Sequence, residues 1–175
     1  MGSGEPLDNY ENVMHFIRII NDKDGLKIGA RHITISTCGI VPGIYKLCEE
    51  NLQFTVAISL HAVTDDKRRM IMPVDKAYPI KDIIKAAKYY TDCTNRRITF
   101  EYTMIKDFND TKKDAEELAL LTKGILCNIN LIPVNSVKGK DFSPSSQATI
   151  TSFKKKLEER GVNVTVRRSL GEDID

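Results

Sequence analysis

Five runs of β-branched and apolar residues alternate with segments of helical periodicity, and this alternation restricts the possible folds more than any other feature of the sequence. Strands that alternate with helices are typical of repeated βα units, in which the strands pair in parallel. We therefore predict an α/β protein with a parallel sheet of five strands. The predicted strands are HITIST (32–37), FTVAISL (54–60), RITFEYTMI (97–105), CNINLIPV (127–134) and VNVTVRR (162–168).

The segments between these runs carry recognisable helix signals. Apolar residues recur at the spacing of one helical face, and residues that favour the first or last turn of a helix flank them. The predicted helix starts are a capping box of Asp8 and Glu11, then Pro79, then Asp110 or Thr111, and finally Ser143 with Pro144, while Gly161 is predicted to end the last helix. The first of these helices is expected to bury Val13, Phe16, Ile17 and Ile20.

The first four predicted strands each end in polar or conformationally unusual residues. These clusters are STCG (36–39), SLHA (59–62), EY (101–102) and PVN (133–135). The carboxyl ends of parallel strands lie at one edge of the sheet, where βα proteins bind their ligands. This favours a partial (β/α) barrel of the TIM-like type, with about five βα units, over an open sheet.

A parallel sheet also needs both of its faces and edges covered. No predicted strand precedes the segment GEP at residues 4–6. We therefore expect residues 1–175 to form a single domain that represents a truncated barrel.

Composition sets only broad limits. Charged residues make up 29% of the chain and the formal net charge is +2, which gives weak support to a nucleic-acid partner. No apolar run is long enough for a membrane span and no signal peptide is recognisable, so we expect a cytoplasmic protein with no membrane partner. The four cysteines lack the close spacing of a metal or cluster motif, so no metal ligand is predicted among Cys38, Cys48, Cys93 and Cys127.

Two segments near the start of the chain offer candidate ligand contacts. The Glu5 carboxylate, beside glycines, could contact a ligand ammonium, or it could be a solvated residue in a flexible terminus. Ser36 and Thr37 could bind a carboxylate or a ribose. They could equally cap a helix that begins near Pro42 and Gly43.

Further candidates lie at the ends of the next strands. Ser59 and His61 are two residues apart, a spacing that places both on one face of an extended strand. His61 could act as an acid or base, contact a ligand, or be a satisfied core residue. Glu101 could be a general base or one half of an ion pair, and Asn135 could pair with an adenine edge or hold a turn. Cys38 is the only cysteine at a strand end; the others are expected to be small apolar residues.

Pairs of basic residues are predicted in loops or at strand ends. An RNA backbone could run across them, although solvated surface is the plainer interpretation of each pair. The pairs are Arg68 with Arg69, Lys138 with Lys140, and Arg167 with Arg168.

Six stretches of the sequence agree in order with a known family. GEP, STCGIVPGI, SLHA and LIPVN, together with INDKDGLKIGARHITIST and VRRSLGEDID, make residues 1–175 resemble the radical S-adenosylmethionine methyltransferases that methylate carbon 2 of an adenine in bacterial 23S rRNA and often in tRNA. The resemblance implies S-adenosylmethionine and a 4Fe-4S cluster as cofactors. It also implies rRNA and tRNA as partners, and an electron donor for the cluster.

The resemblance implies particular contacts to S-adenosylmethionine. Gly4 and Glu5 would meet its amino end, and Asn135 would hold its nucleoside end. The rest of the molecule would be lined by Ser36, Ser59, Leu60 and His61.

Other parts of the family's machinery are not found in this sequence. In the family, a C-x-x-x-C-x-x-C loop for the cluster and a resolving cysteine precede GEP, a methyl-carrying cysteine follows the final D-I-D, and an amino-terminal domain helps to bind RNA. The family's mechanism implies that a methylated cysteine becomes a methylene radical, which adds to the adenine. We therefore assign no catalytic residue and expect this chain alone to be inactive.

Three alternatives stay open at this point. The first is the related methyltransferase that modifies carbon 8 of the same adenine. The second is a non-catalytic module that binds S-adenosylmethionine or a nucleotide. The third is an ordinary barrel enzyme in which Glu101 and His61 form an acid–base pair.

Overall fold

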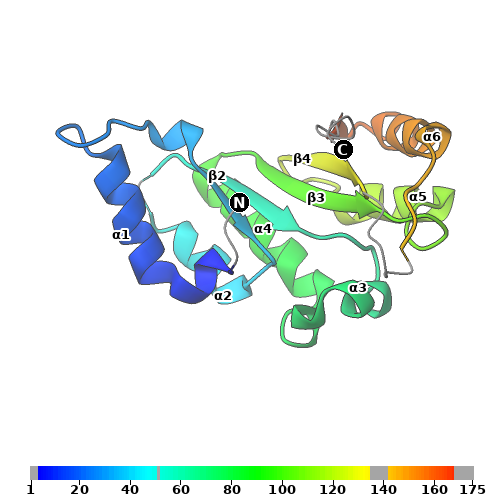
Figure 1. Cartoon of the computed structure of the whole chain (residues 1–175), viewed down its shortest axis with the longest axis horizontal. Helices are drawn as coiled ribbons and strands as arrows, with labels where there is room; N and C mark the ends of the chain where they lie inside the picture. Colours follow the sequence, from blue (N-terminus) through cyan, green and yellow to red (C-terminus); the bar gives the residue numbers. More distant parts are fainter. Residues whose placement is uncertain (1–3, 51, 135–141, 168–175) are drawn as a thin grey trace, which may run out of the picture.

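The computed structural model describes residues 4–50, 52–134 and 142–167. Its five strands lie where the sequence predicts them and all pair in parallel, in the order β1-β2-β3-β4-β5 (Figure 1). The predicted five-stranded parallel α/β fold is therefore confirmed. The strands are β1 (Thr34–Thr37), β2 (Thr55–Ser59), β3 (Ile98–Met104), β4 (Cys127–Pro133) and β5 (Asn163–Val166).

Helices separate successive strands and complete the βα units. No helix in the described part of the chain is long and apolar enough to cross a membrane. The α-helices are α1 (Tyr10–Asn21), α2 (Val41–Leu47), α3 (Asp65–Ile71), α4 (Ile80–Thr94), α5 (Lys112–Leu121) and α6 (Gln147–Glu158). Short 3₁₀ helices are η1 (Pro6–Asn9), η2 (Ala30–His32) and η3 (Pro73–Lys76).

The sheet buries mainly one of its faces, although Ala57 of β2 is buried on the other. Along β3, buried residues alternate strictly with partly exposed ones, so that Phe100 and Tyr102 lie in the core while Glu101 and Thr103 face the other side. The helices pack on the apolar side, and Figure 1 shows α2 and α4 on the same side of β2 and β3. An open parallel sheet with helices on both faces would have continuous apolar strands. We call the polar face opposite the core the helix-free face, because the helices of the described residues pack on the other side. This face and the sequential strand order confirm the partial (β/α) barrel.

Several helix starts confirm the sequence signals. Pro79 precedes α4, as predicted. Thr111, rather than Asp110, caps α5, and its side chain forms a capping box with Asp114. Each side chain bonds a backbone N–H of the first turn, which would otherwise have no partner.

The start of the chain differs from the prediction. Asp8 and Glu11 do not form a capping box, because η1 occupies residues 6–9 and Glu5 caps it instead. Asn9 precedes α1 without a side-chain cap. Phe16 is 58% exposed, so the buried face of α1 is narrower than its apolar spacing suggests.

The last helix also begins later than predicted. Ser146, not Ser143, caps α6 by accepting a hydrogen bond from the Thr149 N–H at 3.1 Å. Pro144 instead forms an isolated bridge with Ile105 at the end of β3. Gly161 follows the helix with φ +78°, the left-handed conformation expected of a helix end.

Candidate ligand site at the carboxyl edge of the sheet

Polar side chains from neighbouring strands meet on the helix-free face near its carboxyl edge. Ser59 of β2 pairs in register with Glu101 of β3, and the Ser59 hydroxyl donates to the Glu101 carboxylate at 3.3 Å. Asn130 and Thr165 continue the same row across β4 and β5 and are hydrogen-bonded at 3.1 Å. Residues in register share one face of a sheet, so this row presents hydroxyl, amide and carboxylate groups together.

Glu5 ties the segment at residues 4–6 to this edge. One carboxylate oxygen accepts a hydrogen bond from the Leu7 N–H at 3.0 Å, and the other accepts one from the Cys38 N–H, just beyond β1, at 2.7 Å. Glu5 is half-buried, so it is not a solvated residue of a loose terminus. A carboxylate has about four acceptor sites, which leaves room for a ligand ammonium. Gly4 beside it is exposed and has φ +117°, a conformation that favours glycine.

The segment after β1 makes a sharp exit supported by a side chain. Ser36 lies on the helix-free face and is half-buried. The hydroxyl of Thr37 accepts hydrogen bonds from the N–H groups of Gly39, at 3.1 Å, and Ile40, at 3.5 Å. Thr37 therefore supports the turn that leads into α2, whose own cap position at Ile40 has no side-chain bond.

Cys38 does not have the properties of a reactive thiol. Burial, reinforced by the nearby Glu5 carboxylate, raises the pKa of the Cys38 thiol to about 12. The thiolate is the nucleophilic form of cysteine, and this environment disfavours it. The position of Cys38 at a strand end therefore serves its backbone contacts rather than cysteine chemistry.

The His61 side chain contacts the same face through a backbone conformation that the sequence does not predict. The extended geometry expected from Ser59 to His61 is wrong, because β2 ends at Ser59 and His61 has φ +59°. Its Nδ1 nevertheless accepts a hydrogen bond from the Thr103 N–H at 3.1 Å, and Thr103 lies on the helix-free face. Leu60, between them, is fully buried, with its N–H bonded to the Glu101 carbonyl at 3.0 Å.

The hydrogen bond at Nδ1 fixes what His61 can offer to a ligand. Burial, with a smaller contribution from the positive charge of Arg68, lowers the pKa of His61 to about 4. The ring is therefore neutral near pH 7, and because Nδ1 accepts the Thr103 N–H, its proton is on Nε2. His61 is thus a neutral hydrogen-bond donor at this edge.

Glu101 does not form the ion pair that the sequence favoured. Within the described ranges it has no cationic partner, and its side-chain contact is Ser59. The His61 N–H donates to the Glu101 carbonyl at 3.2 Å, but within the described residues no hydrogen bond joins the two side chains. The arrangement therefore gives no support to an acid–base pair of Glu101 and His61.

Two positions that organise the edge were missed from the sequence. Arg68 was predicted in an exposed loop, but it lies in α3 with a fully buried side chain. Asn109 is also fully buried, and its amide N–H groups donate to the carbonyls of His61, at 2.8 Å, and Thr103, at 2.6 Å. To find them, the sequence would have had to show that a polar side chain is buried. A single charged or amide residue within a polar stretch gives no such indication.

Some predicted positions lie outside the described residues. These are Asn135, Lys138, Lys140 and Arg168. Arg69 and Arg167 lie within the described residues and are exposed, which agrees with their interpretation as solvated surface residues.

The described residues do not fit an iron–sulfur cluster. Among them, no three His, Cys, Asp or Glu side chains come close enough to hold a metal ion. Burial also raises the pKa values of the Cys48 and Cys127 thiols to about 11, which disfavours the thiolate form that binds iron. The described part of the chain therefore offers no ligand set for such a cluster.

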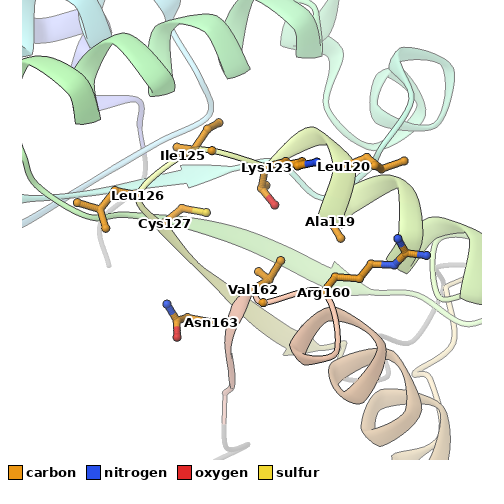
Figure 2. A pocket seen from close by; sticks show the side chains of 12 residues that line it. Ala119, Leu120, Lys123, Ile125, Leu126, Cys127, Arg160, Val162 and Asn163 are labelled. Atoms are coloured by element: carbon orange, nitrogen blue, oxygen red, sulfur yellow. The ribbon is translucent and has the colours of Figure 1, made fainter.

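A hollow of about 380 Å³ lies at the opposite edge of the sheet (Figure 2). It is lined by the connections that enter β4 and β5, including Leu126, Cys127 and Asn163. Those residues precede or begin their strands, whereas ligands of βα folds bind where the strands end. The hollow is therefore separate from the candidate site.

Comparison with known proteins agrees with this geometry. The family model described as the radical SAM superfamily matches residues 1–121. Proteins named probable dual-specificity RNA methyltransferase RlmN are 56% identical in Clostridium botulinum (strain Eklund 17B / Type B) and 55% identical in Clostridium tetani (strain Massachusetts / E88), over all 175 residues. The chain spans about half the length of these curated relatives, 50% in each case.

Solved structures give the same result. A crystal structure of a radical SAM methyltransferase from Sphaerobacter thermophilus has a TM-score of 0.95 and 45% identity, over 99% of this chain and 51% of that one. A domain of pyruvate-formate lyase-activating enzyme from Bacteroides vulgatus has a TM-score of 0.72 at 14% identity, over 96% of this chain and 97% of that one, and shows likeness of fold alone. With two thirds of its residues matched by the family model and its strand ends arranged as described, the chain belongs to the radical SAM superfamily.

Proposed function

We propose that this chain is part of the catalytic barrel of an enzyme that uses S-adenosylmethionine to methylate carbon 2 of an adenine in 23S rRNA and in tRNA. The parent enzyme would act through a methylated cysteine, and the segments on either side of this chain would carry the cluster loop, the two reactive cysteines and an RNA-binding domain. The similarity to RlmN proteins over every residue of the chain supports the substrate class. Because these RNAs are its substrates, we place the parent enzyme in the cytoplasm.

The observation that carries the proposal is the junction of Glu5 with Cys38 at 2.7 Å. It brings the Glu5 carboxylate to the end of β1, which pairs with β2 in the sheet. S-adenosylmethionine carries an ammonium, a carboxylate, a ribose and an adenine, and so needs a mixed set of polar partners. The edge offers a carboxylate, hydroxyls and a neutral imidazole donor.

In this proposal, each residue at the edge contacts a particular part of S-adenosylmethionine. Glu5 would attract the ammonium, with an energy of roughly 4 kcal/mol at 4 Å and an effective dielectric of 20. The hydroxyls of Ser36 and Ser59 and the Nε2–H of His61 would hydrogen-bond oxygen atoms of the ligand. Gly4 lets the backbone approach closely, and Asn135 is proposed for the nucleoside end.

A cluster, when bound in the parent enzyme, would supply the electron that cleaves S-adenosylmethionine, and would take it from an electron donor. None of the four cysteines has the C-x-x-x-C-x-x-C spacing that the family uses for this purpose. We therefore propose that the 175-residue chain binds S-adenosylmethionine but does not methylate RNA by itself.

Three assays test these statements separately. Titration calorimetry of the chain with S-adenosylmethionine should give saturable binding, which Glu5→Ala weakens and the exposed-site variant Glu11→Ala leaves unchanged. An assay for methyl transfer to a 23S rRNA fragment should give no product with the chain alone, and any turnover would contradict the proposed inactivity. With the parent enzyme, nucleoside mass spectrometry should locate the methyl group on carbon 2, and a carbon 8 product would reverse the proposed specificity.

A further inference from the structure

Arg68 is the largest fully buried side chain in the described part of the chain. Each of its N–H donors has an acceptor. A guanidinium has five N–H groups in a fixed planar fork. Two of them bond groups on the helical side, the Asp75 carboxylate at 3.2 Å and the Tyr78 carbonyl at 3.4 Å. The other three bond carbonyls at the strand ends, those of Leu60 at 3.2 Å, Ser59 at 3.2 Å and Cys38 at 2.6 Å.

These contacts continue the pairing of β1 with β2 where the backbone ladder stops. The last residues paired in register are Thr37 and Ile58. The next residues along the two strands are Cys38 and Ser59, and Nη2 of Arg68 donates to the carbonyls of both. One side chain therefore links the Cys38 and Ser59 carbonyls just beyond the last pair in register.

The same contacts connect Arg68 to the candidate ligand site. Cys38 is held from two directions, because Glu5 accepts from its N–H while Arg68 donates to its carbonyl. Ser59 presents its hydroxyl to the helix-free face and its carbonyl to Arg68. Arg68 itself has no exposed surface, so it cannot touch a ligand at this edge.

The charge of Arg68 is balanced, although burying it is unfavourable. Asp75 is fully buried as well, and its second oxygen lies 3.5 Å from a guanidinium nitrogen of Arg69. Taking an ion pair out of water costs free energy that apolar side chains of similar volume would not incur. A buried pair in this position is therefore better explained by the geometry it imposes than by the stability it adds.

We propose that Arg68 is a positioning residue for the S-adenosylmethionine pocket. It fixes the spacing between the segment at residues 36–38 and the segment at residues 59–61, and so controls the affinity for a ligand that it does not contact. This inference rests on the proposed function, since it concerns the same pocket. It predicts that a positive charge at this position is not enough to maintain the pocket. The ammonium of a lysine has its three donors on one atom and cannot reach two strand ends and Asp75 together.

The test compares Arg68→Lys and Arg68→Met with the wild-type 175-residue chain. Calorimetry with S-adenosylmethionine gives the dissociation constant, and thermal unfolding gives the midpoint, so that binding is measured where each variant is folded. Leu157→Ala in α6 is the control, because it removes a fully buried side chain far from β1 and β2 in the strand order. Arg68→Lys retains the charge that Asp75 requires, so it is expected to fold even where Arg68→Met does not.

We expect both Arg68 variants to weaken binding by at least about tenfold, which corresponds to roughly 1.4 kcal/mol. Leu157→Ala should lower the unfolding midpoint at least as much as Arg68→Lys does, and yet bind within about twofold of wild type. A folded Arg68→Lys variant that binds as tightly as wild type would overturn the positioning role and leave the proposed function intact. Failure of the wild-type chain to bind S-adenosylmethionine would overturn the proposed function and the positioning role together.

Discussion

Glu5 and Cys38 are 33 residues apart in the sequence, and a carboxylate oxygen of Glu5 accepts a hydrogen bond from the Cys38 N–H at 2.7 Å. The other oxygen accepts from Leu7, so each carboxylate oxygen holds one backbone amide. A glutamine side chain has only one acceptor oxygen and would place an NH₂ group against one of these N–H donors.

We therefore expect Glu5→Gln to lose one of the two bonds and to lower the free energy of unfolding by about 1–2 kcal/mol. Denaturant unfolding measures this change. Glu11→Gln, at an exposed position of α1, is the matched control and should change stability by less than about 0.5 kcal/mol. Equal stabilities of the two variants would mean that the Glu5 bonds contribute nothing.

The depressed pKa of His61 predicts how stability depends on pH. Burial lowers that pKa to about 4, whereas an unfolded histidine titrates near 6.5. Between these values the unfolded chain binds more protons than the folded chain, so this contribution to stability is complete above about pH 6.5 and is lost as the pH falls toward 4. The full difference amounts to roughly 3 kcal/mol.

His61→Asn removes this titration and keeps a residue that tolerates positive φ. The free energy of unfolding should therefore fall less steeply in the variant than in wild type between pH 6.5 and 4. Measuring the difference between the two chains at each pH cancels the titration of all other groups. His15→Asn on the exposed face of α1 should retain the wild-type slope, and a wild-type slope in His61→Asn would show that His61 is not the group responsible.

Gly39 combines a glycine conformation with a tight contact. It has φ +102°, and a Cβ atom there would lie 2.8 Å from Cδ1 of Ile83 and 3.5 Å from Nη2 of Arg68. Gly39→Ala should therefore be destabilising by about 2–4 kcal/mol, from backbone strain and overpacking together. Gly124 has φ +76° and nothing within 4 Å of the same atom, so Gly124→Ala isolates the cost of the backbone conformation. Equal losses in the two variants would refute the contribution of packing.

Asn109 holds the ends of β2 and β3 together from a buried position. Besides its bonds to the carbonyls of His61 and Thr103, its side-chain oxygen accepts from the Ile105 N–H at 2.8 Å. Asn109→Asp has the same shape but loses both donors, so it should lower stability by about 2–4 kcal/mol.

Hydrogen exchange can show where Asn109→Asp acts. Amides of residues 60–63 and 103–105 should exchange faster in this variant, while amides of β4 should change only as much as the lost global stability requires. Asn12→Asp, on the exposed side of α1, is the corresponding control. A uniform increase across the sheet would contradict a local bracing role.

The sheet could be predicted from the sequence because its strands are local and strongly patterned. A run such as residues 97–105 has β-branched and aromatic residues at alternate positions, and burial along β3 follows this alternation. The polar strand ends were also recognisable, because parallel strands necessarily bring these clusters to one edge. The helix α3 was not, since DDKRRMI has few apolar residues and depends on the cap at Thr64.

The contacts that organise the site could not be predicted, because each depends on residues that only the fold brings together. Arg68 has the sequence context of a surface residue, and its acceptors at Cys38 and Ser59 belong to two other elements. His61 adopts positive φ where Thr103 bonds its ring and Asn109 bonds its carbonyl. These two partners are 42 and 48 residues away from His61 in the sequence. Local propensity contains no information about such distant partners.

The sequential strand order has a consequence for how this chain acquires its structure. Every strand pairs with the one that precedes it in the sequence, so no pairing has to wait for a distant segment to be synthesised. The bonds that join Glu5, Cys38, Ser59 and Arg68 all fall within the first 70 residues. Ribosomal synthesis completes this corner of the pocket before β3, β4 and β5, so we expect the five strands to be added from this corner onward, one βα unit at a time.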